Sequence, residues 1–328
     1  MFDVPRSRIR VRGGNLGALV ASAVLAAALT GCRTSEPTNP NEIAVAVGFY
    51  PLQYLVEELG GDRVRVVNLT RPGAEPHDLE LTAREVITIA KSRTVFYLKG
   101  FQPAVDEAVI ASQVARNLDV TAAAGLTPLT GEANTSTPAL AAPEADHDHA
   151  GHDHAQGQDP HFWLDPHAFA DVANAIAAEL TEIDPAGSTR YEANRTRLVQ
   201  TLDDLADDLR AGLAHCRSTD LVTSHAAFGH LAHLVGFEQH ALALSPEAEP
   251  SPAQLAAITD FVRERGTTTI YTEPLVSAKV AETVAAESGA QLAVLDPIEG
   301  LTTTSAAPDY LGLMRANLAT LKGGQQCQ

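Results

Sequence analysis

Short apolar segments alternate with amphipathic segments along the chain from residue 43 onward. In the first half, this pattern predicts strands at 43–47, 64–69 and 94–98 and helices at 51–59 and 82–91. Thr82 and Glu85 have the spacing of a capping box, which marks the start of the second of these helices. Strands that alternate with helices indicate βα units and a largely parallel sheet.

The same pattern returns in the second half, after a helical zone. Strands are expected near 220–223, 268–272 and 291–295, and helices near 252–265, 279–288 and 309–321. Between the halves, Asp184 and Pro185 predict the start of a long helix that ends near His215. One face of this helix carries regularly spaced leucines, namely Leu198, Leu202, Leu205, Leu209 and Leu213. The sequence therefore predicts an α/β fold of two (β/α) lobes with mainly parallel sheets, bridged by one long helix.

The first 31 residues have the pattern of a signal peptide. A basic stretch that ends at Arg12 precedes an apolar run over 16–29, and Gly31 and Cys32 follow the run. The run is too short to span a bilayer comfortably but has the length of a signal-peptide core. This order resembles the lipobox of bacterial lipoproteins. We therefore expect lipid on Cys32 and an exported chain, anchored to the outer face of the bacterial cytoplasmic membrane. The alternative is an ordinary secretory signal that is cleaved elsewhere.

These patterns divide the chain into five segments. We expect a signal peptide at 1–31, a lipid-anchored tether at 32–42, an N-terminal α/β lobe at 43–166, a helical bridge at 167–216 and a C-terminal α/β lobe at 217–328. Residues 129–158 have no apolar periodicity and predict a mobile loop within the first lobe. Short histidine-rich tracts bind metal, and this loop carries His147, His149, His152 and His154. The alternative is a disordered acidic tract whose metal binding is incidental.

The chain is strongly acidic, with a formal net charge of −18, which argues against nucleic acid as a partner. Such a surface suits cations, although a protein can also be acidic only for solubility. Hydrophobic residues make up 45% of the chain, as is typical of a folded globular protein. Besides Cys32, the sequence has Cys216 and Cys327, and export permits them either to form a disulfide or to stay as two thiols.

Four side chains are candidate metal ligands. His77, His225 and Asp296 lie just beyond the ends of predicted strands, and His161 lies at the entry to the helical zone. Because ligands bind at the carboxyl ends of strands in open α/β sheets, we expect these residues to meet between the lobes. Three imidazoles and one carboxylate can complete a tetrahedron around Zn(II), whereas a carboxylate that binds through both oxygens would suit Mn(II).

Four distinctive motifs surround these residues: GAEPHDLEL at 73–81, DPHFWLDP at 159–166, SHAAF at 224–228 and SPEAEPS at 245–251. They resemble the zinc and manganese solute-binding proteins of ABC importers, the cluster A-I family, over about 43–321. The resemblance implies two lobes bridged by a rigid helix, with the metal in the inter-lobe cleft. It also implies delivery of the ion to an ABC-type permease with a cytoplasmic ATPase.

The resemblance assigns ligands residue by residue. His77, His161 and His225 match the three histidine positions of the family, and Asp296 matches its carboxylate position. Pro76 stands where some zinc members carry a glutamate ligand, which favours Asp296. Manganese members often have glutamate at the third histidine position, so His225 favours Zn(II). Zinc members also carry a loop rich in histidine and acidic residues, so we interpret 129–158 as a collector or sensor for the main site.

Several alternatives stay open at this point. Glu273, at another strand end, could orient a ligand histidine or lie merely at the start of a helix. A metallohydrolase is disfavoured because the chain has no HExxH motif and no clear general base, so we expect a binding protein rather than an enzyme. A Mn(II)-binding importer component, and a surface adhesin or metal chaperone with the same fold, are further alternatives. We expect the chain to act as a monomer.

Overall fold

The computed structural model describes residues 42–126, 159–246 and 248–328. The expected signal peptide, most of the tether, Cys32 and the four loop histidines lie outside these residues. The described residues belong to one compact unit. Within these ranges, we find no helix with the length and apolar character needed to cross a membrane.

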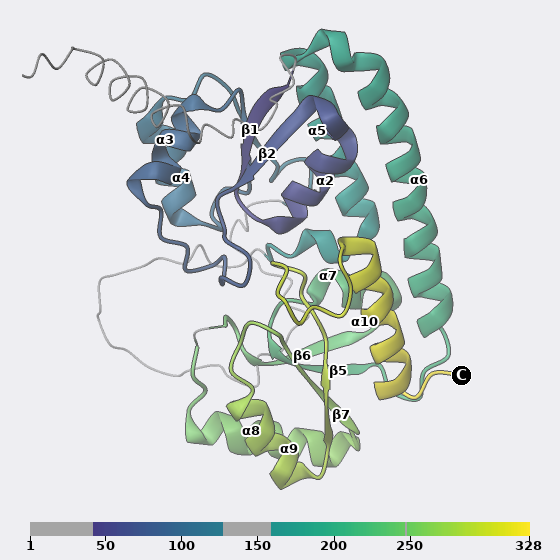
Figure 1. Cartoon of the computed structure of the whole chain (residues 1–328). Coiled ribbons are helices and arrows are strands. Elements are labelled where there is room, and N and C mark those ends of the chain that lie inside the picture. The colour runs from purple at the N-terminus through teal and green to yellow at the C-terminus, as the bar shows by residue number, and fades with distance from the viewer. Residues whose placement is uncertain (1–41, 127–158, 247) are drawn as a thin grey trace, which may run out of the picture. The chain divides into compact units, whose positions relative to one another are not determined.

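The first sheet has four parallel strands in the order β2-β1-β3-β4. Its elements are β1 (Ile43–Val47), α2 (Tyr50–Gly60), β2 (Val64–Asn68), α3 (Ala83–Lys91), β3 (Val95–Tyr97), α4 (Pro103–Ser112) and β4 (Asn117–Asp119). In β1, Val45 and Val47 pack with α2, whereas Ala46 packs on the opposite face with α3 and α4 (Figure 1). Both faces are covered, which explains why β1 is an unbroken apolar run.

The second sheet repeats this arrangement, with parallel strands in the order β6-β5-β7-β8. Its elements are β5 (Asp220–His225), α7 (Gly229–Val235), β6 (Glu238–Ala243), α8 (Pro252–Arg265), β7 (Thr269–Thr272), α9 (Lys279–Ser288), β8 (Gln291–Val294) and α10 (Tyr310–Gly324). Val222 packs with α8 and α9, whereas Leu221 packs on the other face, with the cluster that includes α7 and α10. The prediction of two α/β lobes with parallel sheets is confirmed.

Four elements have no counterpart in the sequence prediction. The strand β4 has only three residues, and one of them is apolar. The helix α4 has apolar residues on several faces, which weakens its period, and α7 has only seven residues. The strand β6 begins with three polar residues, two of which are buried. Short or mixed segments of this kind are placed by tertiary contacts rather than by local pattern.

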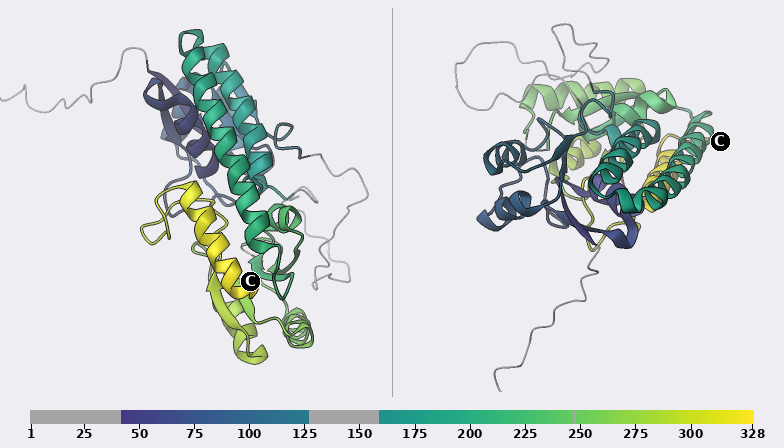
Figure 2. Two further views of the ribbon diagram at one scale, coloured as in Figure 1. Left: turned by 90° about the vertical axis from the view of Figure 1, so that its right-hand side faces the viewer. Right: turned by 90° about the horizontal axis from the view of Figure 1, so that it is seen from above.

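Two helices connect the lobes. The first, α5 (Pro166–Ile183), lies beside α6 (Ser188–Leu213), as Figure 2 shows. The 26 residues of α6 span about 39 Å. All five leucines of its predicted apolar face are buried. The helix packs against α2 near its start and against α10 near its end, and it also contacts α5 and α7, as expected for a bridging helix.

The ends of α6 differ in detail from the prediction. A 3-10 turn, η3 (Pro185–Gly187), separates Asp184 from the start of the helix. The Asp184 carboxylate accepts hydrogen bonds from the Arg63 guanidinium, at 2.7 and 2.8 Å, and from the Tyr191 hydroxyl, at 2.6 Å. Just beyond the other end of α6, Cys216 forms a disulfide with Cys327, which ties the C-terminal segment to the bridge.

Candidate metal site

Three histidines and one glutamate gather between the two lobes. His77, His161, His225 and Glu299 offer nitrogen and oxygen atoms that all lie within 4.8 Å of one another. His77 follows β2, and His161 lies just before η2 (Phe162–Leu164) and α5. His225 is the last residue of β5, and Glu299 follows β8. Each lobe therefore contributes two of the four side chains, since His161 lies in the segment assigned to the first lobe.

The three imidazoles converge on one carboxylate oxygen. The Nε2 atoms of His77, His161 and His225 lie 3.1, 2.8 and 3.7 Å from Glu299 Oε1. The exposed fractions of the side chains are 19% for His77, 2% for His161, 1% for His225 and 0% for Glu299. Four donors in a nearly closed space have the arrangement that a small cation requires, and His77 lies nearest to solvent.

Two further carboxylates contact the Nδ1 atoms of two of these histidines, whose Nε2 atoms face Glu299. The His225 N–H donates to Glu273 Oε1 at 3.0 Å, and His225 Nδ1 lies 2.5 Å from Glu273 Oε2. Asp159 Oδ1 accepts from the His161 N–H at 3.0 Å and lies 2.7 Å from His161 Nδ1. A carboxylate beside Nδ1 keeps the proton there, so Nε2 is directed at the cluster. Glu273 thus lies where a carboxylate that orients His225 must lie.

Asp159 plays the same part for His161 but was not singled out in the sequence. The Asp-Pro-His order of 159–161 was the available signal, because a carboxylate two residues before a histidine can accept from the histidine N–H. Gly229 leaves room for this carboxylate, since a Cβ at Gly229 would come within 2.6 Å of Asp159 Oδ2. His230 Nε2 lies 3.1 Å from the Asp159 carbonyl oxygen, so His230 also contacts this segment.

His77 lies on a loop that is held by a buried glutamine. Gln102 Nε2 donates to the Pro76 carbonyl oxygen at 3.2 Å and to Thr70 Oγ1 at 2.9 Å. Gly48 makes this possible, because a Cβ there would lie 2.5 Å from Gln102 Oε1. The His77 ring packs edge-on against Phe101, with ring centroids 4.7 Å apart. The loop histidine is therefore fixed by polar and aromatic contacts within its own lobe.

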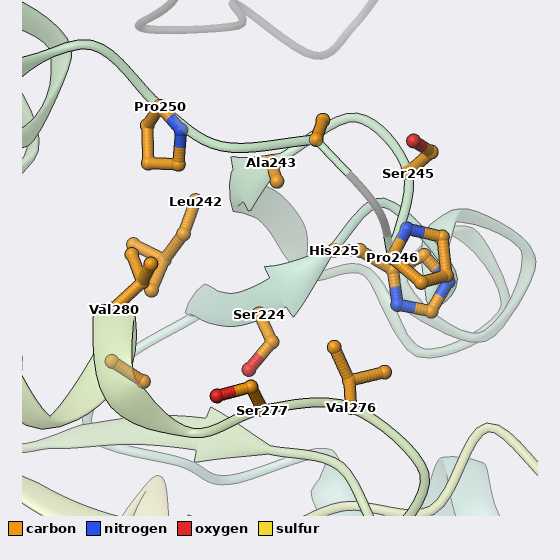
Figure 3. A pocket seen from close by; sticks show the side chains of 12 residues that line it. Ser224, His225, Leu242, Ala243, Ser245, Pro246, Pro250, Val276, Ser277 and Val280 are labelled. Carbon is orange, nitrogen blue, oxygen red and sulfur yellow. The ribbon is translucent and has the colours of Figure 1, made fainter.

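A small pocket adjoins the site on the His225 side (Figure 3). Its volume is about 40 Å³, and Ser224, Pro246 and Val276 are among the residues that line it. At about 10–15 Å³ per water, this space has room for about three waters beside the buried histidine.

The expected carboxylate ligand, Asp296, does not belong to the cluster. Its Oδ1 accepts a hydrogen bond from the Ile298 N–H at 2.8 Å. Glu299, three residues further on, occupies the place beside the histidines instead. The reason is a turn after β8, in which Ile298 has a φ of 60° and changes the direction of the chain. The signal in the sequence was a second carboxylate in Asp-Pro-Ile-Glu at 296–299.

The charged groups of the cluster shift one another's pKa. Burial alone would lower the pKa of His161, but the hydrogen bond to Asp159 and the negative charges of Asp159 and Glu299 outweigh it and raise this pKa to about 10. Burial would raise the pKa of Glu299, but hydrogen bonds from His161 and His77 bring it well below its usual range. Without a metal, the site therefore holds an imidazolium against a carboxylate. For Asp296, burial is the main cause that raises the pKa to about 6.

The donor set fits a divalent cation. In the described parts of the chain, the buried atoms His225 Nε2 and Glu299 Oε2 have no hydrogen-bond partner. Buried polar atoms are costly when they are unpaired, and a cation at this point would satisfy both of them. Three imidazole nitrogens and one carboxylate oxygen are ligands that Zn(II) commonly takes in tetrahedral sites.

Known proteins resemble the chain over most of its length. The family model described as "Zinc-uptake complex component A periplasmic" matches residues 45–324. The zinc-binding protein AdcA of Streptococcus pyogenes serotype M1 is 31% identical over 288 residues, which are 86% of this chain and 56% of AdcA. The zinc-binding lipoprotein AdcA of Streptococcus pneumoniae R6 is 30% identical over 311 residues, which are 93% of this chain and 60% of that protein. The chain thus spans little more than half of these relatives.

A shorter relative matches along nearly its whole length. The high-affinity zinc uptake system protein ZnuA of Bacillus subtilis is 30% identical over 295 residues, which are 88% of this chain and 89% of ZnuA. Among solved structures, the Zn(II)-bound ZnuA-like domain of S. pneumoniae AdcA has a TM-score of 0.70 and 28% identity, and the match covers 87% of this chain and 99% of that domain. The chain therefore belongs to the family of the periplasmic component A of zinc-uptake complexes.

Proposed function

We propose that the chain is the extracytoplasmic, high-affinity Zn(II)-binding component of an ABC-type importer, and that it captures the ion and delivers it to a membrane permease. The observation that carries this proposal is the cluster of His77, His161, His225 and Glu299. Two donors come from each lobe, and the cluster is almost fully closed to solvent. Zn(II) is the cargo in this proposal.

The composition of the cluster favours capture over catalysis. Catalytic zinc sites keep one position open for water or substrate, whereas four protein donors complete a tetrahedron. Asp159 and Glu273 hold Nδ1 of two histidines and so fix the ring orientation that a preformed site needs. Three nitrogen donors also favour Zn(II) over Mn(II), which prefers oxygen ligands.

The placement of the protein outside the membrane is part of the proposal. Cys32 would carry the lipid, and residues 33–42 would tether the folded unit to the outer face of the cytoplasmic membrane. Support comes from the pneumococcal relative, which is a zinc-binding lipoprotein. The histidines of 147–154 would collect Zn(II) for the cluster. Their affinity would be lower than that of the cluster, because their sequence has no apolar periodicity and a tract of this kind loses conformational entropy when it binds.

Zinc titration of the full chain tests this function. The wild type is compared with His161→Ala. Each is measured twice, once with the four loop histidines intact and once with all four replaced by alanine. His233→Ala is the matched control, because His233 is exposed on α7 and lies outside the cluster. We expect one tightly bound Zn(II) per chain in the wild type and in the control, and loss of that site in His161→Ala while weak loop binding persists.

Two outcomes would contradict the proposal. Tight binding that survives His161→Ala would mean that other residues carry the site. Tight binding that disappears only with the loop histidines would assign capture to the 129–158 loop. Competition with a chromophoric chelator measures the affinity, and the same titration with Mn(II) measures the selectivity between the two ions.

A further inference from the structure

The turn after β8 has a strained backbone. Ile298 is fully buried, and its φ of 60° places it in the left-handed region. This region is open to glycine but is rare for a β-branched side chain, because the branched Cβ meets the backbone. Such a conformation persists only where the surrounding structure holds it, and such residues concentrate at functional sites.

A side chain within the same turn stabilises this conformation. Asp296 Oδ1 accepts from the Ile298 N–H at 2.8 Å, which is the bond of an Asx turn. Asn317 of α10 fixes the backbone of Asp296 by two bonds: the Asp296 N–H donates to Asn317 Oδ1 at 2.9 Å, and Asn317 Nδ2 donates to the Asp296 carbonyl oxygen at 2.7 Å. Asp296 is itself buried, with 8% of its surface exposed.

The first lobe also contacts this turn. Trp163 Nε1 donates to the Pro297 carbonyl oxygen at 2.7 Å, and the Tyr310 hydroxyl donates to the Trp163 carbonyl oxygen at 2.5 Å. The Trp163 ring lies 5.2 Å from the His161 ring, measured between centroids. The turn and the segment that carries His161 are therefore fixed to each other.

Glu299 depends on this turn for its position. Within the described residues, the hydrogen bonds to its carboxylate come from His77 and His161, which are the groups it meets across the cleft. Its place in the cluster is therefore set by the backbone of Pro297 and Ile298 rather than by a side-chain hydrogen bond within its own lobe.

We propose that Asp296 is a positioning residue for the metal site, because its Asx turn holds Ile298 in the left-handed conformation that brings Glu299 to the ion. Asp296 acts through the backbone and does not touch the ion. This inference rests on the proposed Zn(II)-binding function of the cluster. It assigns a role to a buried carboxylate that lies three residues before the carboxylate of the cluster.

Substitutions at the two ends of the Asx bond test this role in the full chain. Asp296→Ala removes the acceptor, and we expect a loss of Zn(II) affinity of about 10- to 100-fold, the range typical for groups that orient metal ligands. Asp296→Asn keeps an acceptor at the same place, and we expect an affinity within about threefold of the wild type, because asparagine forms Asx turns as aspartate does. Asp208→Ala, which removes an exposed carboxylate from α6, is the control.

A second substitution separates positioning from a direct effect of the charge. Glycine adopts a positive φ without the penalty that isoleucine meets. We therefore expect Ile298→Gly to restore most of the lost affinity when it is combined with Asp296→Ala. If Asp296 instead acted through its charge on the ion, Asp296→Asn would be as damaging as Asp296→Ala, and Ile298→Gly would restore nothing.

The measurements are the Zn(II) affinity by chelator competition, the visible absorption of the Co(II)-loaded protein, which reports its coordination, and thermal unfolding without metal. Undiminished affinity in Asp296→Ala would overturn the inference while leaving the proposed function intact. Absence of a tight site in the wild type would overturn the proposed function, and this inference with it. If Asp296→Ala does not fold, Asp296→Asn decides, since it keeps the Asx bond without the charge, and a loss of affinity of about tenfold or more in the folded Asp296→Asn variant would refute the role.

Discussion

Binding of Zn(II) should displace one proton from the cluster. Without a metal, the pKa of His161 is about 10, so at pH 8 this imidazole is almost fully protonated. A ligand nitrogen must be neutral to bind Zn(II), and the ion must therefore expel that proton. If His161 had the ordinary histidine pKa of about 6.5, it would release almost no proton when Zn(II) binds at pH 8.

This displacement has a measurable size. Over the range in which the free site holds one proton and the loaded site holds none, each unit of pH changes the apparent affinity by about tenfold, so the affinity at pH 9 should exceed that at pH 7 by about 100-fold. Calorimetry in buffers of different ionisation enthalpy gives the number of protons directly. The loop histidines should be alanine in this experiment, because they also release protons when they bind metal.

A matched variant identifies the source of the proton. Asp159→Asn removes the charge that raises the pKa of His161 most, so proton release at pH 8 should decrease. An apparent affinity that stays constant between pH 7 and pH 9 would refute the reasoning, since it would mean that His161 is already neutral in the free protein.

Four further predictions follow from the site and the fold. Glu299→Gln should lower Zn(II) affinity by about 100- to 1,000-fold in chelator competition, if four ligands share about 10–16 kcal/mol of zinc-binding free energy. Glu273→Gln should lower it by about 10- to 100-fold, because glutamine offers one acceptor oxygen where glutamate offers two. Replacing Cys216 and Cys327 by serine should lower the free energy of unfolding by about 2–5 kcal/mol in urea, because the bond closes a long loop. The metal-free protein should lose thermal stability as pH rises from about 6.5 through 10, since the raised pKa of His161 stabilises the fold only while the imidazole keeps its proton.

Controls make these results specific. Glu287→Gln, an exposed position at the end of α9, should leave Zn(II) affinity unchanged. Reduction of the wild type should reproduce the stability of the double serine variant, and equal stability of the oxidised and reduced proteins would contradict the role of the disulfide. In His161→Gln, the fall in thermal stability between pH 6.5 and pH 10 should be smaller, and an unchanged fall would assign it to other groups.

The sequence identified the histidines of the cluster because each lies in a motif with a distinctive order of residues. Periodicity placed β1, β5 and α6 closely, since a buried strand and an amphipathic helix leave clear patterns in the hydrophobic positions. The carboxylate was misplaced for a local reason. Asp296 lies two residues beyond the end of β8, but the left-handed conformation of Ile298 is a property of the folded backbone, and no residue preference signals it.

The two carboxylates that orient histidines also differ in how far the sequence alone could predict their contacts. Asp159 and Glu273 follow no common spacing rule, because the first contacts a histidine two residues away and the second contacts one 48 residues away. The pairing of Glu273 with His225 depends on the neighbouring positions of β5 and β7 in the sheet. Sequence spacing can suggest the first kind of contact, whereas the second requires the strand order.

The unequal exposure of the four side chains predicts the order in which a bound ion would exchange. His77 has 19% of its side chain exposed and lies on a loop, whereas the other three donors are closed off by sheet ends and by the turn after β8. A water molecule can therefore reach the coordination sphere first at His77. We therefore expect dissociation of Zn(II) to begin at His77, with a residence time that depends on the loop that carries His77, while the three buried donors contribute most to how tightly the ion is held.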